Sequence, residues 1–221
     1  MKQAIFALAL AGLTTFGAHA ANAQQPAAAP GAEVKAGITC LASRSATTFA
    51  FLLTTAPYSA AERREMTQLM PLMLRCTGSS ANLSTNATQL RGLAAEDMYE
   101  RHFTSAQAPH APPIPVAPLL KPNEARAPAE ATPLVPSYAL AECLVAAHPD
   151  QVRAYLAADP TGDAEQTAFR ALTGGLAACI PAGAPRRIGV DGPTFRGILA
   201  EDLYRWSVVQ RDGAASPFAA H

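Results

Sequence analysis

A ten-residue segment occurs twice in this chain, and its recurrence limits the possible folds more than any other feature. Leu90–Tyr99 reads LRGLAAEDMY and Phe195–Tyr204 reads FRGILAEDLY, so Arg, Gly, Ala, Glu, Asp and Tyr recur at the same places. Upstream of each copy lies a cysteine pair, and both pairs are 36 residues apart: Cys40 and Cys76, Cys143 and Cys179. The sequence therefore predicts an internal duplication, with two copies of one unit rather than an open solenoid.

Each copy is expected to form four short helices, because proline and glycine interrupt amphipathic stretches of helical period. In the first copy, Ser59 and Glu62 have the spacing of a capping box at the start of the third helix. An apolar stripe follows the start of that helix in each copy: Met66, Leu69, Met73 and Cys76, then Phe169, Leu172, Leu176 and Cys179. No run of strand length alternates between apolar and polar residues, so the predicted fold class is all-α.

The four cysteines are predicted to form two disulfides. Three pairings are possible in principle, and the duplication favours Cys40–Cys76 and Cys143–Cys179, because each copy should close its own loop. Each bridge would then staple the first helix of its unit to the inner face of the third helix. A metal site is disfavoured, since no cysteine lies at a C-x-x-C spacing and no histidines cluster nearby.

The N-terminal residues 1–23 have the pattern of a signal peptide: Lys2, then an apolar run from Ala4 to Gly17, then small residues suited to cleavage. A membrane anchor is the competing interpretation, but the run is short for a span and no later apolar run is long enough. The mature protein is therefore expected to be periplasmic or secreted, without a transmembrane segment after cleavage. Disulfides form in that oxidising environment.

Composition divides the remaining chain into predicted segments. Residues 104–136 contain nine of the 19 prolines mixed with alanine, which is typical of an extended linker. The predicted segments are a flexible leader at 24–34, repeat one at 35–103, the linker at 104–136, repeat two at 137–208 and a flexible tail at 209–221. The formal net charge is zero, so the chain carries no basic field for nucleic acid.

The repeated segment also supplies the candidate functional residues. On a helical wheel Asp97 and Asp202 fall inside the apolar face, where a carboxylate needs hydrogen-bond donors. Gly92 and Gly197 recur within helices although glycine weakens a helix, which indicates close approach of another backbone. The predicted polar network comprises four residues from each copy: Arg91, Glu96, Asp97 and Tyr99, with Arg196, Glu201, Asp202 and Tyr204. The two tyrosine hydroxyls are expected to complete this network.

Two interpretations of that network are open. In the first, the charged side chains pair with one another and cap neighbouring helices, so that their role is structural. In the second, Glu and Asp of both copies converge on a sugar or a cation, as in a carboxylate-dependent hydrolase with its site between the repeats. Adjacent Glu and Asp point about 100° apart on a helix, which favours the structural interpretation. No catalytic, cofactor-binding or metal-ligating residue is assigned.

The pattern Ala141-Glu142-Cys143, Asp159-Pro160, Cys179-Ile180-Pro181 and Ala200-Glu201-Asp202-Leu203-Tyr204 resembles small uncharacterised secreted proteins of alphaproteobacteria, of the sphingomonad type. The resemblance covers both repeats and implies a helical fold and export, but no activity. Repeat one departs from it in having Ser45-Ala46-Thr47 where repeat two has His148-Pro149-Asp150. The expected function is therefore that of an exported, non-catalytic binding or interaction protein with an unknown protein or small-molecule partner and no cofactor.

Overall fold

The computed structural model describes residues 30–77, 87–103, 113–120, 131, 134–160, 162–180 and 189–220, with the backbone alone at 30–34 and 77. The predicted signal peptide and most of the predicted leader lie outside the described residues. Eight α-helices and a short 3-10 helix, η2, are assigned in the described part: α1 Pro30–Thr54, α2 Ala60–Thr77, α3 Ala87–His102, α4 Val135–Ala147, α5 Pro149–Ala157, α6 Asp163–Thr173, α7 Leu176–Cys179, α8 Gly192–Asp212 and η2 Gly213–Ala215. The predicted all-α fold class is confirmed.

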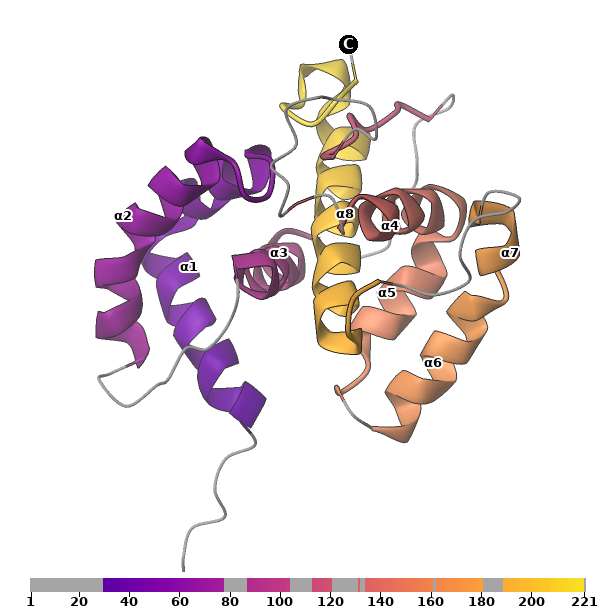
Figure 1. Cartoon of the computed structure of the whole chain (residues 1–221), viewed down its shortest axis with the longest axis horizontal. Coiled ribbons are helices and arrows are strands. Elements are labelled where there is room, and N and C mark those ends of the chain that lie inside the picture. The colour runs from indigo at the N-terminus through magenta and orange to yellow at the C-terminus, as the bar shows by residue number, and fades with distance from the viewer. Residues whose placement is uncertain are drawn as a thin grey trace, which may run out of the picture.

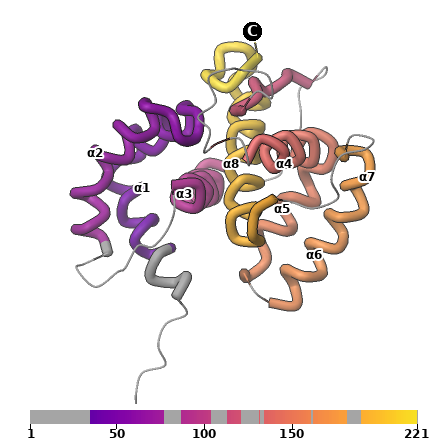
Figure 2. The backbone as a smooth tube through the Cα atoms, viewed as in Figure 1, coloured from indigo at the N-terminus to yellow at the C-terminus, as the bar shows by residue number. Residues whose placement is uncertain are grey.

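The helices α3 and α8 cross at the centre of the molecule (Figure 1). Helices α1 and α2 lie on the α3 side, and α4 to α7 lie on the α8 side, as the tube in Figure 2 also shows. The contact between α3 and α8 is more extensive than that between any other two helices. Both central helices are the ones that carry the repeated ten-residue segment, so the repeat builds the middle of the fold.

Helix α1 contains a break at Ser45, whose backbone leaves the helical region (φ −150°, ψ 44°). In the second half, His148 separates α4 from α5 with nearly the same backbone angles (φ −138°, ψ 50°). Residues 45 and 148 align when the first cysteines of the two copies are superposed. The chain therefore turns at the same aligned position in both halves, with a proline in one and without it in the other.

The predicted capping box forms in part at the start of α2. The amide of Glu62 donates to Ser59 Oγ at 3.0 Å, and Glu62 Oε2 accepts from the amide of Tyr58 at 2.5 Å. The bond to Ser59 satisfies one of the backbone amides that a helix start leaves without partners. The returning bond from Glu62 reaches the amide of Tyr58, one residue before the N-cap Ser59, instead of the N-cap amide. It also turns the second carboxylate oxygen of Glu62 toward the protein interior.

The predicted third helix of repeat two is not continuous. It divides into α6 and α7 at Gly174 and Gly175, where two glycines remove the propensity that would carry the helix onward. A Cβ on Gly175 would lie 2.4 Å from the His148 ring, so this glycine makes room for that side chain. His148 thus packs against the break, and its side chain forms no cap on α5.

Both predicted disulfides are confirmed. Cys40 and Cys76 connect α1 to α2, with their Cα atoms 5.7 Å apart. Cys143 and Cys179 connect α4 to α7, with their Cα atoms 5.6 Å apart. Such bonds indicate an oxidising, extracytoplasmic environment.

The predicted flexible tail is instead packed against the body of the protein, so that expectation was wrong for residues 209–220. Helix α8 runs to Asp212, and Phe218 is buried in the larger hydrophobic core. The amide of Ala117 donates to the Phe218 carbonyl at 2.8 Å, and the amide of Ala220 donates to the Pro115 carbonyl at 3.0 Å. Aromatic packing and these backbone bonds, which composition does not reveal, hold the tail in place.

Part of the predicted linker is packed as well. Residues 113–120 run without a helix beside α8 and form an isolated bridge from Val116 to Ala219. Leu120, Ala131 and Leu134 are buried in the core. Helix α4 begins at Val135, so the final residues of the predicted linker are helical. The other linker residues lie outside the described part of the chain.

Among the described residues, one helical stretch has the length and apolar composition of a membrane span, Lys35–Thr54 in α1, with a mean hydropathy of 1.3. The core helix of a water-exposed protein can meet the same criteria. In this structure the stretch packs against α2 and α3 and contributes Leu41, Phe49 and Leu52 to a hydrophobic core.

Candidate functional site

The crossing of α3 and α8 depends on two glycines. A Cβ built on Gly92 would lie 2.2 Å from the Cα of Gly197, and one built on Gly197 would lie 3.2 Å from the Cα of Gly92. Only glycine leaves room at position 92, where a methyl group would overlap the backbone of α8, while at position 197 a methyl group would make a tight contact. Arg91 and Arg196 precede the two glycines, so the crossing carries both arginines into the interior.

Arg91 is completely buried and bonded on every side. Its guanidinium donates to the carbonyls of Leu52 at 2.8 Å and Thr55 at 2.9 Å, which end α1. It also forms ion pairs with Glu62 of α2 at 3.3 Å and with Glu201 of α8. Because guanidinium groups donate in a planar fork, one arginine can cap a helix end and bind two carboxylates at once.

Arg196 makes the corresponding set of contacts in the other half. It donates to the carbonyls of Tyr155 at 3.1 Å and Leu156 at 2.6 Å, at the end of α5. It pairs with Glu165 of α6 and with Glu96 of α3, both at 3.1 Å. Each arginine therefore pairs with one carboxylate of its own half and one of the other half, so ion pairs link the two halves across the crossing.

Burial sets the electrostatics of this site. Burial raises the pKa of Glu62, although the neighbouring Arg91 opposes that shift. Burial alone would lower the pKa of Arg91, but Glu201 and the other anionic groups around it hold the pKa above the ordinary arginine value. Tyr138 donates to Glu201 Oε2 at 3.0 Å, and burial followed by the charge of Glu201 raises the tyrosine pKa well above its usual value.

The two repeated aspartates are both buried, but their surroundings differ. Asp97 accepts from Thr39 Oγ1 at 2.9 Å and from Arg101 Nε at 2.6 Å. Asp202 has Arg205 Nη1 at 3.4 Å, and its second oxygen has no hydrogen-bond partner within the described part of the chain. Both carboxylate oxygens of Asp97 therefore accept hydrogen bonds, whereas among the described residues only one oxygen of Asp202 has a donor.

Asp202 also lies near a second carboxyl group, that of Glu142. Burial raises the pKa of Asp202 well above its ordinary value, and the charge of Glu142 raises it further against the opposing effect of Arg205. Burial likewise raises the pKa of Glu142, whose Oε1 accepts from the amide of Leu119 at 3.0 Å. Arg205 in turn donates to the Ala117 carbonyl at 2.6 Å, so this cluster holds the segment 113–120 against α4 and α8.

The structure brings together most, but not all, of the residues that the sequence singled out. Arg91 with Glu201 and Arg196 with Glu96 meet at the crossing, whereas Asp97 and Asp202 form separate pairs. Tyr99 does not complete the network: its Oη is buried and finds no partner among the described residues, and its ring stacks on Phe103. The Tyr204 ring packs edge-on against Phe103 and Phe218. Sequence reasoning missed the contributions of several residues: Glu62, Tyr138, Glu142, Glu165, Arg101 and Arg205.

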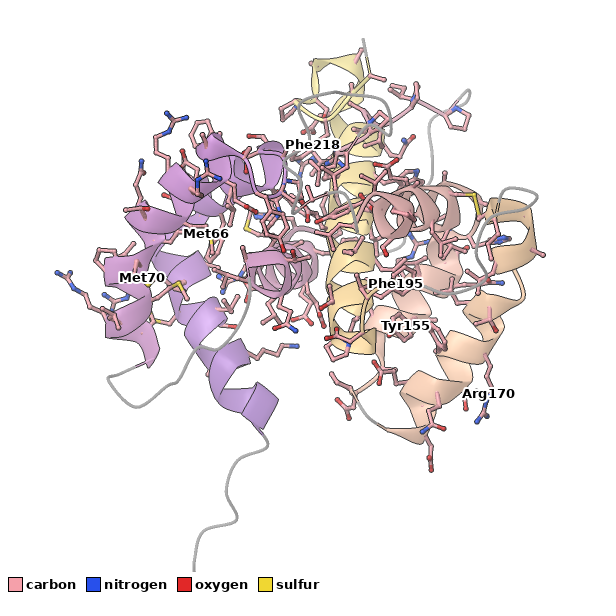
Figure 3. The ribbon with its side chains drawn as sticks, viewed as in Figure 1. Met66, Met70, Tyr155, Arg170, Phe195 and Phe218 are labelled. Carbon is pink, nitrogen blue, oxygen red and sulfur yellow. A yellow bond between two sulfur atoms is a disulfide. The ribbon has the colours of Figure 1, made fainter. Side chains whose placement is uncertain are left out.

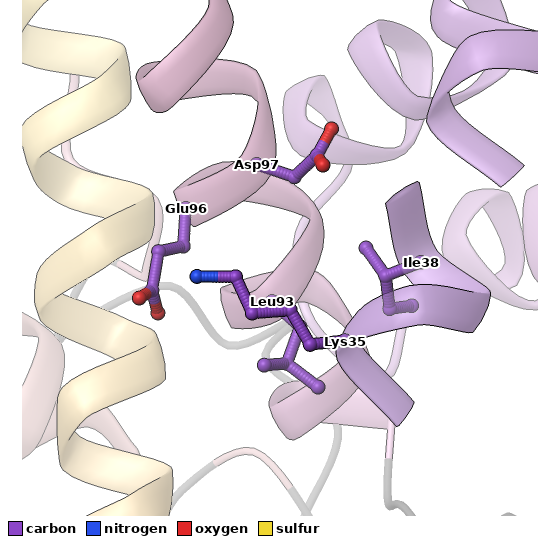
Figure 4. Close-up of a pocket in the computed structure, with 5 residues that line it drawn as sticks. All are labelled: Lys35, Ile38, Leu93, Glu96 and Asp97. Atoms are coloured by element: carbon purple, nitrogen blue, oxygen red, sulfur yellow. The ribbon is translucent and has the colours of Figure 1, made fainter. Parts of the chain in front are cut away.

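A small hollow lies beside the crossing, lined by Lys35, Ile38, Leu93, Glu96 and Asp97 (Figure 4). Its empty space is about 210 Å³, part of which is open solvent. Ligand pockets usually enclose roughly 300 Å³ or more. Lys35 at its rim pairs with Glu100 at 3.0 Å and Glu96 pairs with Arg196, so two of its charged groups are already bound.

No group of three or more His, Cys, Asp or Glu side chains that could hold a metal ion occurs among the described residues. Comparison with protein-family models, curated proteins and solved structures finds no match to this chain. The geometry of the chain's own residues is therefore the basis for its proposed function.

Proposed function

We propose that this chain is an exported, non-catalytic helical protein that acts by binding a partner in the cell envelope, either in the periplasm or after secretion. Its two disulfides support a location in an oxidising compartment. We include in this proposal that the chain is one of the small secreted alphaproteobacterial proteins that its sequence resembles.

The proposal includes the architecture: two tandem copies of a disulfide-stapled four-helix unit, joined at the α3–α8 crossing. Three aligned features support it. The backbone leaves the helical region at Ser45 and at His148, and each half has one disulfide between cysteines 36 residues apart. Arg91 donates to a carbonyl at the end of α1, and Arg196 donates to one at the end of α5. Glu62 and Glu165, which pair with the arginines, also align with each other.

The observation that carries the non-catalytic proposal is the use of the repeated charges within the fold. Glu201 is bound by Arg91 and Tyr138, and Glu96 is bound by Arg196. A carboxylate that serves as nucleophile or general base must reach the substrate. These groups instead neutralise buried guanidinium groups, which is a structural task.

Native mass spectrometry of the protein purified from the envelope tests this proposal. The expected result is an oxidised chain with both disulfides, shortened at the signal site, that retains a partner or binds one on titration. Four free thiols in the exported protein would contradict the proposed framework.

A carboxylate-dependent hydrolase is the alternative, and one observation favours it. Glu142 and Asp202 are two neighbouring carboxyl groups whose pKa values are raised, and a general acid also has a raised carboxyl pKa. Asp202 is buried, however, and the pair lies within the second half rather than between the halves. Glycoside turnover that Asp202→Asn abolishes, without loss of folding, would favour the hydrolase over the binding protein.

A further inference from the structure

Two of the three large apolar side chains that are exposed among the described residues lie on the outer face of α2, and the third is Phe51 on α1. Met70 and Leu74 are exposed to 49% and 60%, although large apolar side chains on a helix normally turn inward. Met70 lies at the edge of the molecule away from the crossing (Figure 3). Six residues define this α2 outer face: Arg63, Arg64, Met70, Pro71, Leu74 and Arg75.

These residues form two neighbouring rows along the helix. Arg63, Met70 and Leu74 follow the spacing i, i+7, i+11, and Arg64, Pro71 and Arg75 follow the same spacing one position later. Residues so spaced lie above one another on one side of a helix. The apolar pair is therefore flanked by arginines, while the acidic Glu62 points inward to Arg91 and Glu65 is half-buried.

The second copy shows that the helical hairpin does not require this chemistry. Both α2 and the α6–α7 segment carry one disulfide and bury one leucine, Leu69 or Leu172. With the first cysteines aligned, Arg63, Arg64, Met70, Leu74 and Arg75 correspond to Gln166, Thr167, Thr173, Ala177 and Ala178. Small or neutral residues stand at all five aligned positions of the second copy, so a hairpin of this kind forms without basic or exposed apolar side chains there. In the first copy, Arg63 also donates to the Tyr58 carbonyl at 2.7 Å.

We propose that the α2 outer face docks on an anionic phospholipid surface, with α2 parallel to the membrane plane. Arginine binds phosphate through two parallel hydrogen bonds, and exposed methionine and leucine can enter the boundary of the acyl chains. Helix α2 lies at the edge of the fold (Figure 1), so its outward side can contact a flat surface without a groove. A peptide partner would instead require a groove or an open sheet edge. The net charge of the chain is zero, so the attraction is local to this face.

This inference deepens the proposed function, because it names the surface that a non-catalytic envelope protein would bind. The test is flotation of the purified mature protein with vesicles of phosphatidylcholine alone, or of phosphatidylcholine and phosphatidylglycerol in equal parts. Binding to the anionic vesicles is expected, and high salt should weaken it because the arginines are exposed. Equal binding to both kinds of vesicle would overturn the proposal.

Variants that take the residues of the second copy separate the two contributions. The triple variant Arg63→Gln, Arg64→Thr, Arg75→Ala should lose about a hundredfold in partition coefficient, since each basic residue contributes about fivefold. The double variant Met70→Thr, Leu74→Ala should also weaken binding to anionic vesicles. The binding that remains should keep the salt dependence of the parent protein, because the arginines are still present. Arg170→Gln on the exposed side of α6 removes one surface arginine of the other copy and should change binding little (Figure 3). Unchanged binding in a folded triple variant would overturn the assignment to α2.

A reverse graft tests sufficiency. In the triple variant, Gln166→Arg, Thr167→Arg and Ala178→Arg should restore part of the binding through α6 and α7. Capture of an acidic protein with no vesicle binding would overturn the lipid proposal and leave the proposed binding function standing. Hydrolysis of the lipid would overturn the non-catalytic function itself.

Discussion

Gly92 and Gly197 lie backbone to backbone where α3 crosses α8, and the contact is unequal. A Cβ added to Gly92 would meet the Cα, carbonyl carbon and oxygen of Gly197 at 2.2 to 2.8 Å, whereas one added to Gly197 has no atom closer than 3.2 Å. The two glycines occupy the same place in the repeated segment, yet only one points directly into the other backbone.

Gly92→Ala should therefore destabilise the protein more than Gly197→Ala. Separating the helices to admit the methyl group at position 92 should cost about 2–3 kcal/mol, beyond what alanine adds in helix propensity. Gly197→Ala should lie within about 1 kcal/mol of the parent protein. Urea unfolding measures both, and Gly192→Ala, whose Cβ would meet nothing within 4 Å, is the control. Equal losses at 92 and 197 would contradict this geometry.

Removal of the Arg91 charge should leave Glu201 buried without its main partner. Arg91→Met should lower the free energy of unfolding by about 3–5 kcal/mol, as for other broken buried pairs. Adding Glu201→Leu should recover part of that loss, because the uncompensated carboxylate is then gone. Lys35→Met breaks an exposed pair with Glu100 and should cost less than about 1 kcal/mol. A double variant less stable than Arg91→Met would argue against the pairing.

The Glu142–Asp202 pair should make stability fall as the pH rises. Burial raises the pKa of both carboxyl groups in the folded protein, so the folded state binds more protons than the unfolded state. The stabilisation is fully present below about pH 4, where free carboxyls titrate, and is lost as the pH rises through the raised pKa values. Asp202→Asn should flatten this slope and stabilise the protein at alkaline pH, because the buried carboxylate of the parent protein is then replaced by a neutral amide.

Asp97→Asn is the matched control for that experiment. Asp97 is bonded to Thr39 and Arg101, and Thr39 stands at the position that aligns with Glu142. Its replacement should destabilise the protein by about 1 kcal/mol at neutral pH through loss of charged hydrogen bonds. Opposite signs at the two repeated aspartates, measured by thermal unfolding across pH, are the expected result.

Each disulfide should contribute comparably to stability. A closed loop of this length restricts the unfolded chain by about 4 kcal/mol. Cys40→Ala with Cys76→Ala, and Cys143→Ala with Cys179→Ala, should each reduce the free energy of unfolding by about that amount. Loss of both bridges should approach the whole stability of a small protein, typically about 5–15 kcal/mol. Denaturant unfolding with intact mass analysis checks which bridges are present in each variant.

The sequence predicted those features that depend on short-range pattern or on the repeat. The bond from the Glu62 amide to Ser59 and both cysteine pairings follow from local spacing or from alignment of the copies. Close approach at Gly92 and Gly197 also followed from the sequence, because glycine is unfavourable inside a helix unless a neighbour requires it.

The ion pairs between the two halves at the crossing could not be predicted from the same pattern. Arg91 and Glu201 are separated by 110 residues, and their pairing depends on how α3 and α8 cross. Tyr138 and Glu142 lie on α4, outside the repeated segment, so the repeat gave no signal for them. The packed tail was missed because its anchors are Phe218 and backbone bonds to residues 115 and 117, while its composition is small and polar.

The ion pairs between the two halves have a consequence for how the sequence can change. Glu201 belongs to one half and Arg91 to the other, and the same holds for Glu96 and Arg196. A change in either half is therefore tolerated only with a compensating change in the other, as between the subunits of an obligate dimer. Neither half is therefore expected to stay folded without the other, because each would keep a buried charge whose partner is gone.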